Sequence, residues 1–339
     1  MAVAILTIAL LLLLVTPEAA WAWGPPTHAF LGSHILGDLA LLPPVVRELL
    51  SAHPQRFLYG NLAADITQAK EYAEYNRHCH NWAVGFEVLE EADTPELQAF
   101  ALGYLSHLAA DTIAHNVFVP RQLVSTPHVK KLGHTYWEYR FDTQLGDEFL
   151  RLARQIVTDD HAEPDALLEQ VLTQPFFSFQ TNKRIFQHII HLSNRDRWNN
   201  LWVRMADGSR WELAPETVDR HLELTLAYVR DLLTVGGSSL SRRLDPIGRK
   251  RLALAKRLRR EHFRAARRET TRDLASAPIS TLTLNDATRF FATRAKTQAL
   301  IERRAEEHFP EPPWPASSAS QLDSRDVDRF WSEFAYSLA

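Results

Sequence analysis

The apolar residues of this chain recur every three or four positions over most of its length. The clearest runs contain Leu31, Ile35, Leu36 and Leu39, and then Leu97, Phe100, Ala101, Tyr104, Leu105 and Leu108. This spacing gathers apolar side chains on one side of an α-helix, whereas a strand would need an alternation every two residues. With 45% hydrophobic residues, the composition is that of a folded protein and excludes a disordered chain. We therefore predict an all-α, multi-helix fold.

Prolines indicate where several of these helices begin or end. Pro43-Pro44 and Pro95 stand where helices would start, and Thr94 is a natural N-cap. Pro120 and Pro127 are expected to bracket a loop. The one strand signal is a short hairpin over 202–212, around Asp207-Gly208.

Composition shifts divide the chain into four parts. We expect a signal peptide at 1–22, a zinc-binding catalytic core at 23–155, and a helical second half at 156–309 that completes the domain. Four prolines and several serines then form a linker before a terminal helix, so 310–339 is predicted as a helical C-terminal extension. A Gly-Gly-Ser-Ser break at 236–239 precedes a strongly basic helix.

The first 22 residues have the pattern of a targeting segment. A 12-residue run from Ala4 to Val15 contains a single polar residue, and the small-residue triplet Ala20-Trp21-Ala22 follows it. The run is too short for a comfortable membrane span, so we predict a cleaved signal peptide. The mature protein would begin at Trp23 and be secreted or periplasmic. The alternative is a retained N-terminal anchor helix.

One helical segment combines histidines and an aspartate in an otherwise apolar run. His107, Asp111 and His115 stand four residues apart, so on a continuous α-helix they cover an arc of about 80°. Buried polar groups need partners, and a divalent metal ion satisfies all three at once. The alternative is a network of hydrogen bonds within the core.

Further candidate ligands lie on both sides of this motif. His134 and Glu138 form another i,i+4 pair, although such pairs are also common on solvated helix faces. The remaining candidates are the lone carboxylate Asp65, either imidazole of His78-Cys79-His80, and the amine and carbonyl of a new N-terminus at Trp23 with His28. Nitrogen and oxygen ligands in this mixture suit zinc better than calcium.

Taken in order, these motifs resemble the zinc-dependent phospholipase C and S1/P1 nuclease superfamily. The shared pattern is Trp-Gly-x-x-x-His, a lone Asp, His-Asn-Trp, His-x-x-x-Asp-x-x-x-His and His-x-x-x-Glu, over roughly 23–141. The resemblance implies an all-helical fold with three zinc ions at the bottom of a cleft. Two features depart from the family pattern: the short step from Asp111 to His115, and Cys79, the only cysteine, beside His80.

The resemblance also implies a ligand set for each ion. One zinc ion would be held by Asp65, His80, His107 and Asp111. A second would be held by His115, His134 and Glu138. The third would be held by the amine and carbonyl of Trp23 with His28, and Asp111 would bridge the first and third ions.

The activity that the resemblance implies is zinc-dependent hydrolysis of a phosphodiester, with Asp65 as a candidate base. Phospholipase C is our prediction, because predicted export, Glu138 after His134 and the absence of paired cysteines favour that branch. The Trp23 to His28 spacing is instead typical of the nuclease branch. The alternatives are an S1/P1-type nuclease or 3'-nucleotidase, and an exported metal-binding module without activity.

The segment 242–272 carries thirteen Lys and Arg residues against three acidic ones, although the whole chain has a net charge of -3. One interpretation is contact with an anionic membrane surface or a phosphate backbone. The other is an amphipathic helix packed on the catalytic domain, with its charges paired to the acidic remainder. Phospholipid or another phosphodiester is the expected partner, and no stable nucleic-acid partner is predicted.

Overall fold

The computed structural model describes residues 23–67, 74–126, 133–172, 177–192, 213–276 and 299–315. Across these ranges the secondary structure is helical throughout, with short 3-10 turns and no strand. The prediction of an all-α fold is confirmed. The predicted signal peptide, the hairpin at 202–212 and the terminal helix after 315 lie outside the described residues.

The helices up to residue 142 supply the candidate ligands. They are α2 (Pro25–Gly37), α3 (Pro44–Ala52), α4 (Pro54–Ala63), α5 (Trp82–Glu90), α6 (Pro95–Ile113), the π-helical turn η4 (Ala114–Phe118), α7 (Val119–Ser125) and α8 (Gly133–Asp142). Short 3-10 turns lie at η1 (Leu39–Leu41) and η3 (Tyr75–Arg77). The helix starts predicted at Pro44 and Pro95 are confirmed, and the Thr94 side chain caps α6 by accepting from the Leu97 N–H.

The later helices pack around this set and extend beyond it. They are α9 (Asp147–Thr158), α10 (Ala162–Val171), α11 (Phe179–Leu192), α13 (Pro215–Val235), α14 (Arg249–Ser276) and a helix at 299–308, with 3-10 turns η5 (Gly236–Ser238) and η6 (Ser241–Arg243). No helix in the described ranges is both long enough and apolar enough to cross a membrane.

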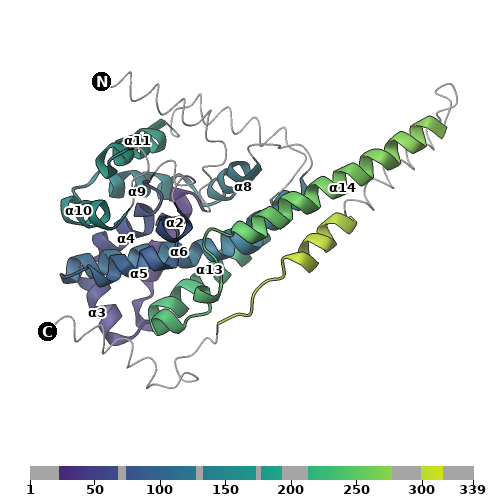
Figure 1. The fold of residues 1–339 in the computed structure, drawn as a ribbon. Coiled ribbons are helices and arrows are strands. Elements are labelled where there is room, and N and C mark those ends of the chain that lie inside the picture. Colours follow the sequence, from purple (N-terminus) through teal and green to yellow (C-terminus); the bar gives the residue numbers. More distant parts are fainter. Residues whose placement is uncertain are drawn as a thin grey trace.

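Helix α6 is the centre of the fold. Every residue from Gln98 to Ile113 is buried, because α4, α5 and α13 pack against it from different sides (Figure 1). A helix covered all round can carry polar side chains only where they find partners inside the protein. His107 and Asp111 are therefore held in a fully enclosed position.

Two glycines let α4 approach α6 at backbone distance. A Cβ atom on Gly60 would lie 2.7 Å from the Tyr104 nitrogen and 2.8 Å from the Gly103 Cα, and closer still to the Phe100 carbonyl oxygen. A Cβ on Gly103 would likewise overlap the Phe57 carbonyl oxygen. Only glycine permits this approach.

The segment after α6 differs from the prediction. Residues 114–118 form a π-helical turn in which the Val119 N–H bonds to the Ala114 carbonyl, five residues earlier. Pro120 was predicted to open a loop, but it lies in the first turn of α7. A proline has no N–H to donate to the Asn116 carbonyl, so it fits directly after a turn that breaks the regular α-helical bonding.

The basic segment also begins its helix later than predicted. Gly248 has a φ of +61°, and the Asp245 carboxylate accepts from the N–H groups of Ile247 and Arg249. Together with Pro246 these residues stop a helix from starting at Arg242, so α14 begins at Arg249. From there α14 leaves the body of the protein as a long arm, and the helix at 299–308 returns along it (Figure 1).

Candidate metal centre

Eight of the nine predicted ligand residues bring their side chains into three groups that are buried except at His134. Within each group the ligand atoms lie within 4.8 Å of one another. The groups are His28 with His107 and Asp111; Asp65 with His80 and His107; and His115 with His134 and Glu138. These residues come from α2, α6, η4, α8 and the segments after α4 and before α5.

Asp111 lies between the first two groups. Its Oδ1 atom is 3.3 Å from His28 Nε2, whereas its Oδ2 atom is 3.2 Å from His80 Nε2 and 3.4 Å from His107 Nε2. Asp65 approaches the same imidazole of His80 from another side, at 3.2 Å. One carboxylate thus presents its two oxygens to two different groups, the arrangement that a bridging ligand requires.

Backbone carbonyls fix the orientation of two histidines. His107 Nδ1 donates to the Asn61 carbonyl at 2.8 Å, and His115 Nδ1 donates to the Pro246 carbonyl. A carbonyl can only accept, so the proton of each neutral ring stays on Nδ1 and the lone pair stays on Nε2. A histidine that binds a metal ion through Nε2 needs this lone pair. The hydrogen bond from its other ring nitrogen fixes the orientation of the ring and so tunes the metal site.

The π-helical turn separates His115 from the other two residues of its motif. His115 is the second residue of this turn, directly after α6. Among the groups of potential ligands, it lies with His134 and Glu138 and not with His107 and Asp111. Its imidazole instead packs at 5.1 Å between centroids against His134, whose Nε2 is 2.8 Å from Glu138 Oε1.

Burial sets the protonation state of His28 and His115. It lowers the pKa of His28 to about 4, helped by the neighbouring His107 ring stacked 3.8 Å away. Burial also lowers the pKa of His115 to about 3, with His134 as the next cause. Both rings are neutral at pH 7, which is the state that binds a metal ion.

Asp111 keeps its charge despite complete burial. Burial alone would raise the pKa of its carboxyl, but His107 and contacts from His28 and His80 hold that pKa well below its usual range. A buried carboxylate of this kind needs positive charge nearby. The neighbouring histidines supply part of this positive charge only when their rings are protonated.

The donor set fits zinc. The two ring nitrogens of His28 and both carboxylate oxygens of Asp111 are buried without a hydrogen bond of good geometry. Buried polar atoms without partners are rare in folded proteins and indicate a missing ligand or ion. Imidazole nitrogens and carboxylate oxygens in groups of three are the ligands that zinc sites use.

Comparison with known families agrees with this geometry. The family model described as zinc dependent phospholipase C matches residues 27–196, half of the chain. The chain belongs to the zinc-dependent phospholipase C family. No curated protein and no solved structure gave a match. At the level of the family, the protein is a zinc-dependent phosphodiester hydrolase.

The side chain of Trp23 anchors the segment before α2 beside the metal centre. The indole is fully buried, packs against Phe118 and Phe141, and donates from Nε1 to the Ala110 carbonyl at 3.2 Å. Ala110 directly precedes Asp111. Whether the Trp23 amine binds metal stays a prediction.

Asp142 is a residue that the sequence reasoning missed. It accepts a 2.6 Å hydrogen bond from the Thr27 hydroxyl and further bonds from the N–H groups of Gly24 and Thr27. Helix α2 has no cap from its own N-cap residue, so Asp142 satisfies its first N–H groups from α8. One feature of the sequence could have indicated Asp142: it stands four residues after Glu138 and so lies on the same face of the helix.

The choice between His78 and His80 follows from the directions of their rings. His80 Nε2 faces Asp65 and Asp111, whereas His78 Nδ1 accepts from the His80 backbone N–H at 3.0 Å. The Cys79 thiol is buried 3.2 Å from His80 Nδ1. His80 is thus the imidazole that this family member brings to the predicted ligands.

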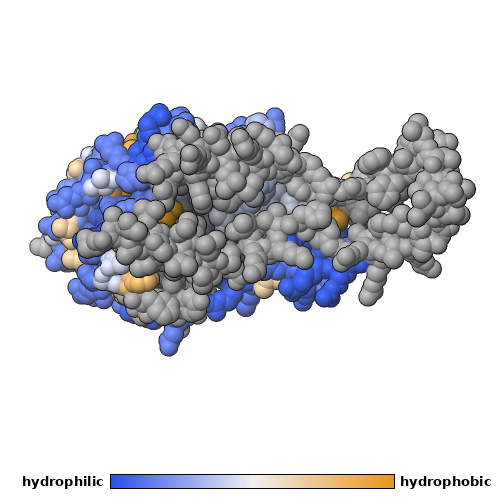
Figure 2. All heavy atoms as spheres, turned by 90° about the horizontal axis from the view of Figure 1, so that it is seen from above, coloured by the Kyte–Doolittle hydropathy of each residue, from blue (hydrophilic) through white to orange (hydrophobic). Residues whose placement is uncertain are grey.

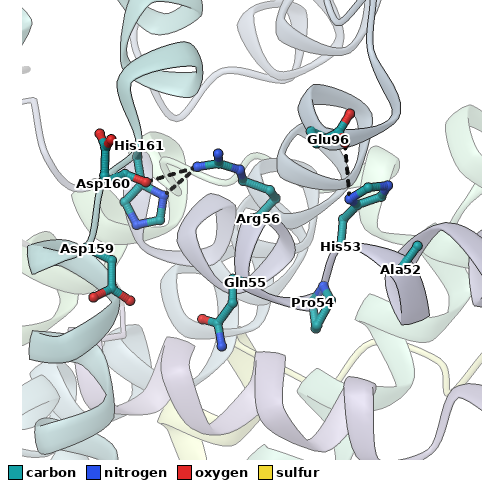
Figure 3. Close-up of a pocket in the computed structure, with 9 residues that line it drawn as sticks. All are labelled: Ala52, His53, Pro54, Gln55, Arg56, Glu96, Asp159, Asp160 and His161. Carbon is teal, nitrogen blue, oxygen red and sulfur yellow. Dashed lines mark hydrogen bonds and ion pairs between the residues drawn. The ribbon is translucent and has the colours of Figure 1, made fainter.

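A surface pocket of about 350 Å³ lies apart from the three groups (Figure 3). Arg56 crosses it and donates to His161 Nδ1 and the Asp160 carbonyl, and His53 pairs with Glu96 at its other end. It contains none of the predicted ligands. Its lining consists of Ala52, His53, Pro54, Gln55, Arg56, Glu96, Asp159, Asp160 and His161.

Proposed function

We propose that this protein is an exported phospholipase C that cleaves the phosphodiester of phospholipid headgroups. The observation that carries the proposal is Asp111, a buried carboxylate whose two oxygens face two different groups of histidines in a member of the zinc-dependent phospholipase C family. Glu138 beside His134 and the single cysteine support this branch over the nuclease branch.

The zinc ions would be held by the three groups, with Asp111 shared between two of them. Bound zinc would supply Lewis-acid chemistry, which polarises a phosphoryl oxygen and acidifies water. The protein's own contribution is to orient some imidazoles and to keep others neutral. The Asn61 and Pro246 carbonyls bind Nδ1 of His107 and His115, which leaves Nε2 of each ring as the metal-binding atom, and burial keeps His28 and His115 neutral by lowering their pKa.

Asp65 is the candidate base of the reaction. Its carboxylate lies 3.2 Å from His80 Nε2 and 4.0 Å from His107 Nε2 at the edge of the second group. From this position it could orient a water molecule and accept its proton. The same residue is a predicted ligand, so its two roles compete.

Signal-peptide cleavage completes the site in this proposal. Cleavage after Ala22 frees the amine of Trp23, whose indole is already anchored one residue from Asp111. Export and assembly of the third metal position would then be a single event. A mature protein with one alanine added before Trp23 tests this, since it should retain one zinc ion fewer and lose activity. Full zinc content and activity would contradict it.

A parallel substrate assay tests the activity. The mature, zinc-loaded protein is incubated with phosphatidylcholine, phosphatidylinositol and single-stranded DNA, and the products are identified. We expect release of a phosphorylated headgroup, and loss of that release in His107→Ala. The matched control is His221→Ala, which removes a buried histidine outside the three groups.

Three results would overturn the proposal. Release of mononucleotides without headgroup release would make the protein a nuclease. Equal activity in the wild type and His107→Ala would place the chemistry elsewhere. Absence of hydrolysis together with one zinc ion or none would make it a metal-binding module, because structural zinc sites are closed and four-coordinate.

A further inference from the structure

Helix α14 carries a continuous basic face. Its exposed residues recur every three or four positions, so they form one stripe along the helix. We call these residues the basic stripe: Arg249, Lys250, Ala253, Lys256, Arg257, Arg260, Glu261 and Arg264. The stripe contains six cations and one carboxylate. The only carboxylate, Glu261, is 3.9 Å from Arg257 with both side chains more than half exposed, and such a pair neutralises little.

The opposite face of α14 holds the helix on the protein. Ala255 and Leu258 are buried, Leu252 packs against the core, and α14 contacts α7. Arg251 donates to the His308 carbonyl at 2.8 Å and so ties the returning helix to α14. The charges of the stripe are therefore displayed by a helix whose orientation is fixed. Figure 2 shows strongly hydrophilic residues along the described part of this arm.

The start of α14 is joined directly to the metal centre. The Pro246 carbonyl accepts from His115, and the Asp245 carbonyl accepts from the Asn116 side chain at 2.8 Å. Gly248 lies so close to His115 that a Cβ atom there would be 2.6 Å from the His115 carbonyl oxygen. The first cation of the stripe, Arg249, is the next residue. A surface bound by the stripe would thus be held in a fixed position relative to the metal centre.

We infer that the basic stripe of α14 docks the protein on an anionic phospholipid bilayer. The inference rests on the proposed function, since docking would bring the substrate's own surface to the metal centre. A straight row of cations matches a flat, negatively charged surface. Binders of single-stranded nucleic acid interleave aromatic side chains with their cations, whereas the eight stripe residues include no aromatic residue and a ring packs on the stripe only at its start, where Tyr75 lies against Arg249. The stripe also lacks large apolar residues, so the contact is electrostatic and sensitive to salt.

Vesicle binding of the full mature protein tests the inference. Vesicles of phosphatidylcholine are compared with vesicles that also contain phosphatidylserine, at low and at physiological salt. Each cation near an anionic bilayer strengthens binding about fivefold, so a triple Lys256→Gln, Arg257→Gln, Arg260→Gln variant should bind the anionic vesicles about 100-fold more weakly. The matched control removes three exposed arginines from α3, α9 and α11, namely Arg47→Gln, Arg151→Gln and Arg184→Gln, and should bind like the wild type.

Hydrolysis measured in parallel separates this inference from the proposed function. The stripe variant should cleave a soluble, monomeric phosphatidylcholine at the wild-type rate and lose activity only on anionic vesicles. Equal vesicle binding by the variant and the wild type, or equal binding to neutral and anionic vesicles, would overturn the docking. Loss of single-stranded DNA binding with unchanged vesicle binding would assign the stripe to nucleic acid instead. Vesicle binding that depends on the stripe, without hydrolysis of any phospholipid, would leave the docking intact and refute the proposed activity.

Discussion

The contact between α4 and α6 offers a sharp test of how the fold positions the metal centre. Helix α4 carries Asn61, whose carbonyl orients His107, and leads into Asp65. Gly60→Ala adds one methyl group at the point where the two helix backbones touch. The added carbon would lie 2.7 to 2.8 Å from backbone atoms of Tyr104 and Gly103. Ordinary contacts need about 3.5 Å or more, and the Phe100 carbonyl oxygen would be closer to the added carbon than either of these atoms, so the helices would have to separate by at least about 1 Å.

Two opposing effects set the size of the change in stability. Replacing glycine by alanine inside a helix is favourable by about 1 kcal/mol. Overpacking a core costs typically about 1 to 3 kcal/mol, and here the obstructing atoms are backbone, which cannot move away by changing rotamer. The cost of overpacking therefore exceeds the gain in helix propensity. We expect Gly60→Ala to lower the free energy of unfolding by about 2 kcal/mol. A displacement near 1 Å at a catalytic group lowers rates by about 100-fold.

The assay combines urea unfolding, zinc content and phospholipid hydrolysis of the same preparation. Gly37→Ala is the matched control, because no atom beyond its chain neighbours and the nearby backbone of α2 lies within 4 Å of the position its Cβ would take. The control should be as stable as the wild type or slightly more stable, with unchanged zinc content. If Gly60→Ala matched the control in urea midpoint, zinc content and rate, the reasoning that backbone contact positions Asp65 and Asn61 would be refuted.

Three further predictions concern buried charge. Metal-free protein should lose stability as the pH falls from 6.5 towards 4, because the unfolded chain takes up protons there while burial holds the pKa of His28 at about 4 and that of His115 at about 3. Urea midpoints that stay constant over this range would contradict the prediction. Burial raises the pKa of Asp142 from 3.8 to about 8, so the unfolded chain releases this proton first, and the metal-free wild type should lose stability relative to Asp142→Asn as the pH rises from 3.8 to about 8. A difference between these two proteins that does not change with pH would count against it. Lys183→Met removes the 2.6 Å ion pair with buried Asp165 and should cost about 3 kcal/mol of unfolding free energy without changing zinc content, as checked by urea unfolding and metal analysis.

Much of the candidate site was predictable because its side chains repeat at helical intervals. His107 and Asp111 are one turn apart on a helix that the apolar spacing already indicated, and they do share a group. His134 and Glu138 follow the same rule. The spacing did not indicate the π-helical turn that contains His115. Pro120, which fits after such a turn, carried that information and was interpreted as the start of a loop.

The sequence by itself determined the all-α fold, the family and the types of residue that gather at the metal centre. Periodicity and motif order are properties of the sequence alone, so they can be recognised without knowing how the helices pack. Only the tertiary structure decided that Asp111 faces two groups, that the Asn61 and Pro246 carbonyls orient two histidines, and that Asp142 caps α2. Backbone carbonyls have no residue signature, and contacts between residues distant in the sequence depend on close packing such as that of Gly60 on α6. Packing also placed the basic stripe on the helix that begins beside His115.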